Sequence, residues 1–138
     1  MASDEANSSY RNLLVWQRAM DLVTDIYRLT KTFPRDEVFG LASQMRRASV
    51  SIPSNIAEGK GRHSSKELLQ FLFHARGSLL ELQTQVTIAE RLSYLDKKEA
   101  VRLEESSSRV GQLLNGMIRR FRQPRSPETV SDAESDPQ

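Results

Sequence analysis

Apolar residues recur along this chain in alternating steps of three and four, the spacing that keeps one face of an α-helix apolar. Four segments show the pattern. Their stripes are Val15, Ala19, Leu22, Ile26, Leu29 and Phe33; Leu41, Met45, Ala48, Ile52 and Ile56; Leu68, Leu72, Ala75, Leu79, Leu82, Val86 and Ala89; and Leu103, Ser107, Val110, Leu114, Met117 and Phe121. No strand pattern competes with them. The sequence therefore predicts an all-α protein, an up-down-up-down antiparallel four-helix bundle.

Local signals predict where these helices begin and end. Pro34 is expected to stop the first helix. Gly59 is expected to end the second, because glycine accepts the left-handed conformation that terminates helices. Caps are predicted before the third and fourth helices, where an N-cap residue precedes a Glu by three positions: Ser64 with Glu67, and Asp96 with Glu99.

Pro53 interrupts the pattern of the second helix. It lacks an N–H and crowds the carbonyl of Ser49, which costs about 3 kcal/mol or more in a helix interior. We expect a kink near Pro53 with nearby serine hydroxyls satisfying the freed backbone groups; a break between two shorter helices is the alternative. Asn55 takes a position where the heptad would place an apolar residue. It is either a buried residue that sets register or, as we favour, a partly exposed one that compensates for the kink.

The third helix has a wider apolar surface than one intramolecular face requires. Leu69, Phe71, Phe73 and Leu80 lie off its main stripe. This helix is therefore either central in the bundle or in contact with another subunit.

The length of 138 residues predicts one domain. We expect a flexible N-terminal lead-in over residues 1–12, the bundle over 13–122, and a disordered acidic tail over 123–138, which is rich in Pro, Ser, Glu and Asp. No apolar run reaches membrane-spanning length and the N-terminus is polar and acidic, so a cytoplasmic location is expected. The absence of Cys excludes disulfides and thiolate sites.

The net charge of +2 conceals a more basic folded part. Residues 1–9 and 123–138 together hold one basic and six acidic residues, which leaves 19 basic and 12 acidic residues in 10–122. An excess of this kind favours polyanionic partners.

The basic residues suggest where such a partner binds. They are Arg46, Arg47, Lys60, Arg62, Arg119, Arg120 and Arg122. In an antiparallel bundle the end of the fourth helix lies near the end of the second, so we expect these groups to form one patch. Arginine predominates and suits bidentate phosphate contacts. The alternative is a solvated surface with favourable cations at helix C-termini. No aromatic-interleaved platform is visible, so binding should follow charge and shape rather than base sequence.

Catalytic motifs are missing. There is no nucleophile elbow, zinc-protease helix or phosphate-binding loop; Gly59-Lys60-Gly61 resembles part of the last but follows a helix. His63, Glu67 and His74 are better explained as solvated or capping side chains than as metal ligands. Glu58 and Glu81 are expected to pair with arginines rather than with each other. We predict a non-enzymatic protein without a cofactor or metal.

Several segments resemble a known family. They are Val15-Trp16-Gln17, Phe33-Pro34, Gln44 with Arg46-Arg47, Ser51 to Gly59, and Ala75 with Ser78, Glu81 and Leu82. On these segments residues 13–95 resemble the bacterial four-helix-bundle family of 23S rRNA-intervening sequence proteins. The resemblance to the family is strongest between Gln44 and Arg62. The candidate structural motif in this stretch comprises Gln44, Pro53, Asn55, Glu58 and Gly59.

The resemblance implies more than the residues show by themselves. Members are similar in fold to the accessory variability protein of diversity-generating retroelements, a ring-forming pentamer that engages nucleic acid through a basic surface. It therefore implies a homopentamer and no catalytic residues. We expect an oligomeric bundle that binds RNA or an RNA–protein complex through the basic residues named above. The alternative is a protein-interaction scaffold without direct nucleic-acid contact.

Overall fold

The computed structural model describes residues 9–122 of the protein, and this part is almost entirely helical. Four long helices follow one another along the chain: α2 (Leu14–Thr30), α3 (Leu41–Lys60), α4 (Ser65–Arg91) and α5 (Lys97–Phe121). Short 3-10 turns precede α2 and α3: η1 (Tyr10–Asn12) and η2 (Arg35–Glu37). Residues 9–122 contain no strand, so the predicted all-α four-helix fold is confirmed. The predicted disordered tail and residues 1–8 of the lead-in lie outside the described residues.

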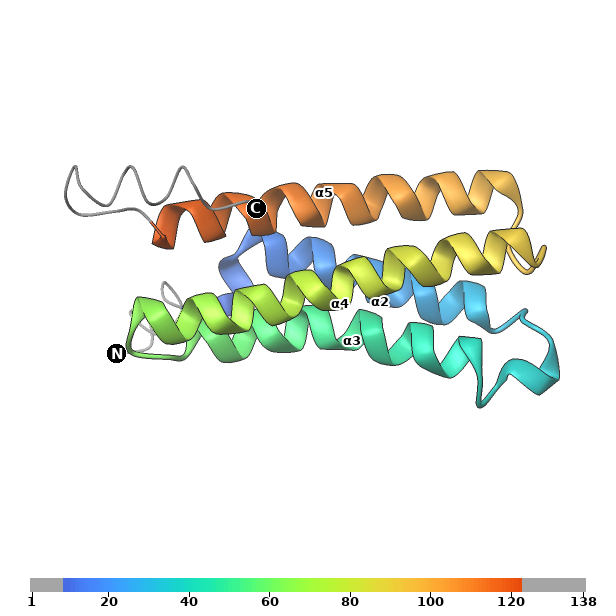
Figure 1. Ribbon diagram of the computed structural model, residues 1–138, viewed down its shortest axis with the longest axis horizontal. Helices are drawn as coiled ribbons and strands as arrows, with labels where there is room; N and C mark the ends of the chain where they lie inside the picture. The colour runs from blue at the N-terminus through green and yellow to red at the C-terminus, as the bar shows by residue number, and fades with distance from the viewer. Residues whose placement is uncertain (1–8, 123–138) are drawn as a thin grey trace.

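The four helices pack side by side around one core. Each contacts the next in the chain, and α5 returns to contact α2, while α3 and α5 lie diagonally opposite each other. Figure 1 shows neighbouring helices running in opposite directions. The start of α2, the end of α3, the start of α4 and the end of α5 therefore share one end of the molecule (Figure 1).

The periodic apolar positions form the core, as predicted. All seven positions of the third stripe, from Leu68 to Ala89, are buried in α4. In α5 the stripe shifts slightly at its end, because Ile118 is buried and Met117 is only half-buried. The amphipathic pattern thus identifies the inward face of each helix.

Capping explains where α4 and α5 begin. Before α5, the N–H of Glu99 donates to Asp96 Oδ1 (2.7 Å) and the N–H of Asp96 donates to Glu99 Oε1 (3.0 Å), a complete capping box. Before α4, the N–H of Glu67 donates to Ser64 Oγ (3.1 Å). The predicted capping box at Asp96 is confirmed in full. At Ser64 the bond to the hydroxyl is confirmed, but the returning bond from the Ser64 N–H to the Glu67 carboxylate, which a capping box also predicts, is not among the bonds of this structure.

The prediction that Gly59 ends the second helix is wrong. α3 continues through Gly59 to Lys60, and its C-cap Gly61 keeps right-handed backbone angles (φ −82°). Gly59 is instead buried against α4, where an added Cβ would lie 2.9 Å from Cβ of Phe71 and 3.0 Å from Cδ1 of Leu68. The missing side chain allows the two helices to approach closely.

α3 is one continuous helix through Pro53, which excludes the predicted alternative of a break; the kink itself stays a prediction. Asn55 is half-buried, and its Nδ2 donates to the carbonyl oxygen (2.8 Å) and to Oγ (2.9 Å) of Ser51. Ser51 Oγ lies 2.8 Å from Ser78 Oγ on α4. Asn55 is therefore the partly exposed, hydrogen-bonded residue that we favoured, and it supports a polar link between α3 and α4.

Residues 10–12, which precede the predicted boundary at residue 13, form the 3-10 turn η1. η1 is capped by Ser9, whose Oγ accepts the N–H of Arg11 (3.1 Å). The ring of Tyr10 packs edge-on against Trp16 with centroids 5.3 Å apart. Aromatic packing and this cap give residues 10–12 a defined structure, which corrects the expected flexible lead-in at these positions.

Candidate nucleic-acid interface

One end of the bundle gathers segments that are far apart in the sequence. We call it the basic end and define it by residues 9–18, 58–76 and 115–122 (Figure 1). Side-chain contacts join its parts: Gly59 of α3 packs on Phe71 of α4, and Nη1 of Arg76 on α4 donates to Oδ1 of Asn115 on α5 (3.1 Å).

The positive charge of the folded part is concentrated at this end. The basic end holds nine basic and two acidic residues: Arg11, Arg18, Lys60, Arg62, Lys66, Arg76, Arg119, Arg120 and Arg122 against Glu58 and Glu67. The opposite end, residues 25–47 and 85–105, holds nine basic and eight acidic residues. The basic end therefore carries a formal excess of +7 and the opposite end only +1, a polarity that the sequence totals conceal.

The structure separates the predicted binding residues into two groups. Lys60, Arg62 and the three arginines of α5 lie at the basic end. Arg46 and Arg47 do not, because they precede Lys60 by about four turns of the same helix, or about 20 Å along its axis. The expectation of a single patch is therefore wrong for this pair, since both residues lie in the half of α3 near the opposite end of the bundle (Figure 1).

Arg46 also has a structural role. Its Nε donates to Oγ1 of the buried Thr30 (2.8 Å), and its Cζ lies 5.0 Å from the ring centroid of Tyr27. These contacts fasten α3 to the last turn of α2. Arg47, its neighbour, is exposed.

The remaining members of the candidate motif differ in their surroundings. Gln44 and Glu58 are exposed. Within residues 9–122, the predicted ion pairs of Glu58 and Glu81 with arginine do not form; the ion pairs there join Arg28 with Asp25 and Lys97 with Glu90. Glu81 Oε2 instead accepts from Nε2 of Gln85 (3.3 Å).

Arginines at the basic end lie over aromatic rings, an arrangement that we did not predict. Measured from the guanidinium Cζ to the ring centroid, Arg62 lies 4.8 Å from Phe71, Arg76 5.1 Å and Arg122 5.8 Å from Phe73, and Arg120 5.3 Å from Phe121. Such contacts are favourable because a cation is attracted to the face of an aromatic ring. The position of Phe71 and Phe73 off the main apolar stripe could have indicated that their rings have such partners. The partners themselves were harder to predict, because Arg62 and Arg122 come from outside α4.

The opposite end of the bundle is closed by a carboxylate. Glu37 Oε1 accepts the N–H of Leu41 (2.9 Å), and its Oε2 accepts the hydroxyl of Tyr94 (2.9 Å). The Leu41 N–H, and then the Tyr94 hydroxyl, lower the pKa of Glu37 below its ordinary value. The bond to Glu37, followed by desolvation, raises the pKa of Tyr94. This contact ties the α2–α3 connection to the α4–α5 connection, and the sequence did not reveal it.

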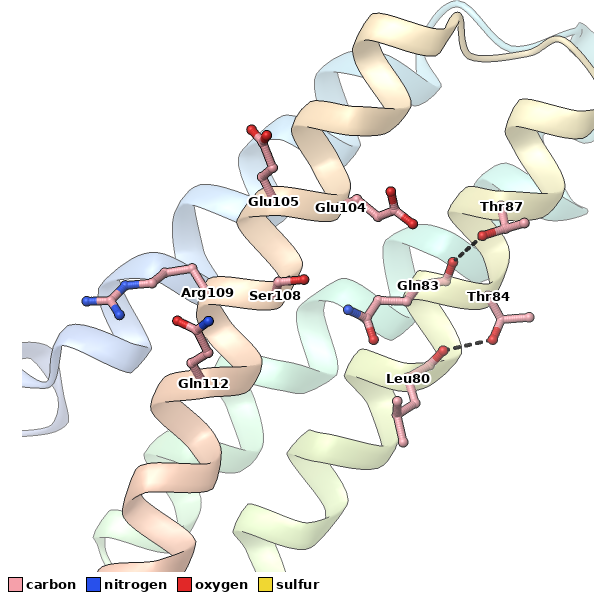
Figure 2. A pocket seen from close by; sticks show the side chains of 9 residues that line it. All are labelled: Leu80, Gln83, Thr84, Thr87, Glu104, Glu105, Ser108, Arg109 and Gln112. Atoms are coloured by element: carbon pink, nitrogen blue, oxygen red, sulfur yellow. Dashed lines mark hydrogen bonds between the residues drawn. The ribbon is translucent and has the colours of Figure 1, made fainter.

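A shallow groove of about 810 Å³ runs between α4 and α5. The hydroxyls of its two threonines form hydrogen bonds within α4 (Figure 2): Thr84 Oγ1 donates to the carbonyl oxygen of Leu80 (2.9 Å), and Thr87 Oγ1 donates to that of Gln83 (3.2 Å). Within the part of the chain that the structure describes, no three His, Asp or Glu side chains gather as a metal site would require. No helix among residues 9–122 is both long and apolar enough to cross a bilayer.

The fold and this surface define a class, a four-helix bundle whose positive charge is gathered at one end. Residues 11–116 match the 23S rRNA-intervening sequence proteins, and the chain belongs to that family. A similar solved structure is a protein of unknown function from the S23 ribosomal protein family of Bacteroides thetaiotaomicron. It is 19% identical, has a TM-score of 0.69, and the match covers 76% of this chain and 98% of that chain. At this identity the likeness shows the shared fold. No curated protein matches the sequence. The comparisons indicate no enzymatic family.

Proposed function

We propose that this protein is a non-enzymatic nucleic-acid-binding bundle whose basic end binds RNA or an RNA–protein complex. The observation that carries the proposal is the formal excess of +7 at that end. Lys60, Arg62, Arg119, Arg120 and Arg122 are the binding residues that we assign to it. Guanidinium groups present a planar fork of N–H donors that matches phosphate oxygens.

A surface of this kind binds through the phosphate backbone. Each phosphate that it neutralises releases counterions, so the affinity should fall steeply as the salt concentration rises. Phosphate contacts carry no base information, so the preference among sequences should be small.

The test compares two charge-matched variants on the same helix. Arg119→Ala with Arg120→Ala removes two positive charges from the basic end, and Lys97→Ala with Lys98→Ala removes two from the opposite end. Binding of a labelled RNA is measured by fluorescence anisotropy at several salt concentrations. The first variant should bind more weakly. Its plot of log K against log salt should also be less steep, with a negative slope whose magnitude is smaller by about 1.4, roughly 0.7 for each lost contact to a single strand.

The lysine variant is the control for net charge. It should change the affinity less than the arginine variant and leave the salt slope nearly unchanged. Equal losses in the two variants would mean that only the total charge matters and would remove the basic end as the site.

We further propose that the protein is a homo-oligomer, with the pentamer implied by its resemblance as the expected state. Exposed apolar residues on α4 and at its C-cap, namely Leu80, Ile88 and the C-cap residue Leu92, support self-association. An oligomer would present several basic ends to one polyanion and raise its avidity. Light scattering should give about five times the chain mass of 15.7 kDa. A mass of one chain across the concentration range would contradict this proposal.

One observation favours the second candidate function, a protein-interaction scaffold. Phe39 is 95% exposed next to the exposed Val38, in the connection that leads to α3 and away from the basic end. Exposed aromatic residues are frequent anchors of protein interfaces. The scaffold would be supported over RNA binding by a stoichiometric protein partner that stays bound after nuclease treatment. The Phe39→Ser variant should lose this partner, and the Arg119/Arg120 variant should retain it.

A further inference from the structure

The outer face of α4 at the basic end has an unusual composition. No carboxylate occurs from Leu68 to Leu80, a stretch of more than three helical turns. Phe73, His74 and Gly77 are exposed on this face. An RNA strand that approached here would meet aromatic and amphipathic groups, and the first carboxylate beyond them on α4 is the exposed Glu81, one turn after Gly77.

Arg76 is held in place before any ligand arrives. Its Nη1 donates to Asn115 Oδ1 on α5 (3.1 Å), and its Cζ lies 5.1 Å from the ring centroid of Phe73. The side chain is half-buried. Because these contacts already restrict its rotamers, Arg76 loses little further conformational entropy when it binds a ligand.

Phe73 offers an aromatic surface beside this arginine. The residue is 36% exposed, and Arg122 lies over the same ring at 5.8 Å. Proteins that bind single-stranded nucleic acid combine basic surface with aromatic side chains on which bases stack. Arginine guanidinium planes are also used to stack unpaired bases of RNA.

Gly77 keeps the helix surface next to Phe73 open. It lies one turn further along α4, is exposed, and a Cβ added to it would meet nothing within 4 Å. Glycine inside a helix lowers its stability by about 1 kcal/mol relative to alanine. Because the space around Gly77 would admit a Cβ, packing gives no reason for a glycine here. A ligand, however, can approach the backbone closely at this point.

We infer that Phe73 and Arg76, with the open surface at Gly77, form a site for an unpaired nucleotide of single-stranded RNA. The base stacks on the Phe73–Arg76 pair, and the adjoining phosphates meet the arginines of the basic end. A duplex keeps its bases stacked and paired, so it cannot use the site in this way. The inference rests on the proposed function and adds its ligand class, a strand with accessible bases.

The experiment is a cycle that varies the protein and the ligand together. The full-length protein, Phe73→Leu and Val101→Ala are titrated with three probes: a 12-nucleotide oligouridine, an abasic oligonucleotide of the same length, and a 12-base-pair RNA duplex. Leucine keeps the apolar bulk of Phe73 but removes its π face. Val101, which is 38% exposed near the start of α5 at the opposite end of the bundle, is the control for loss of apolar surface.

Phe73→Leu should weaken oligouridine binding by about 5- to 150-fold, the range expected for one stacked base. It should change abasic-strand and duplex binding by less than about twofold. Arg76→Lys, which keeps the charge but loses the planar group, should show the same selectivity. Val101→Ala should leave the binding of all three probes nearly unchanged.

Other outcomes would overturn the inference in distinguishable ways. If Phe73→Leu weakens all three probes equally, the residue supports the fold rather than a base. If wild-type protein binds the abasic strand as tightly as oligouridine, stacking does not contribute; in both cases the Arg119/Arg120 result still decides the proposed function. If no probe binds at low salt, the proposed function and this site fail together.

Discussion

At the scale of single residues, two glycines inside α helices have opposite surroundings. Gly59 is buried, and a Cβ there would lie 2.9 Å from Cβ of Phe71. Gly77 is exposed, and a Cβ there would meet nothing within 4 Å. Local sequence alone cannot distinguish them, because the difference depends on what the neighbouring helix places against each one.

These surroundings predict opposite effects of alanine on stability. Gly59→Ala should lower the free energy of unfolding by about 1–3 kcal/mol, because α3 and α4 must move apart. Gly77→Ala should raise it by about 0.4–1 kcal/mol, because alanine has the higher helix propensity and restricts the unfolded chain. Urea denaturation of the two variants provides the measurement. A gain at both positions would show that the contact between Gly59 and Phe71 is not tight in solution.

At the scale of elements, helix starts depend on interactions within a few residues. The hydrogen bonds of the capping box before α5 span three positions, so the spacing of Asp96 with Glu99 was visible in the sequence. The end of α3 was not, because the glycine that resembled a terminator packs against a different helix. Elements are therefore most predictable where their causes are local.

The complete capping box predicts a difference between the two N-caps. Asp96→Ala should lower stability by about 1 kcal/mol, within a range of 0.5–2, because it leaves the N–H of Glu99 without its acceptor. Ser64→Ala should cost less, since its cap lacks the reciprocal bond among those of this structure. Thermal unfolding followed by circular dichroism compares them. A larger loss at Ser64 would contradict the importance given to the reciprocal bond.

At the scale of the whole molecule, the two ends have different characters. The basic end carries the excess of positive charge, whereas the opposite end is closed by hydrogen bonds of Glu37 to Leu41 and Tyr94. The bond from Tyr94 joins two connections across a separation of 57 residues in the sequence. The closed end should therefore respond to pH through the charge of Glu37.

The sign of this pH response follows from the pKa shifts. The folded-state pKa of Glu37 is lowered from 4.5, so its stabilisation is present above pH 4.5 and is lost as the pH falls through the lowered value. The pKa of Tyr94 is raised from 10.0, so its contribution is present below pH 10 and is lost as the pH rises through the raised value.

Thermal midpoints of wild-type protein and Glu37→Gln check the acid side of this response. The wild-type protein should be the more stable at pH 7, and the difference should shrink in acid as Glu37 takes up its proton. Glu58→Gln is the control, since Glu58 is exposed. A difference between wild type and Glu37→Gln that stays constant from pH 7 to pH 3 would exclude a charge-dependent role for Glu37.

The candidate site was predictable only in part. The sequence showed the excess of basic residues in the folded part. Of the seven arginines and lysines chosen from the sequence as binding residues, five lie at the basic end. Arg46 and Arg47 were misplaced because a bundle end is defined by where helices stop, and these residues lie in the first half of α3. The pairing of Arg76 with Phe73 and Asn115 depends on the rotation of α4 against α5, which periodicity alone does not determine.

The sequence by itself determined the four helices, their inward faces and the caps of α4 and α5. Each of these depends on hydrogen bonds and side-chain spacing within about one helical turn, so the neighbouring residues contain the necessary information. The tertiary structure alone decided the role of Gly59, the aromatic partners of the arginines, the closing contact of Glu37, and which of the basic residues share one end. These features join segments that are distant in the chain, and their distances depend on the direction and rotation of whole helices.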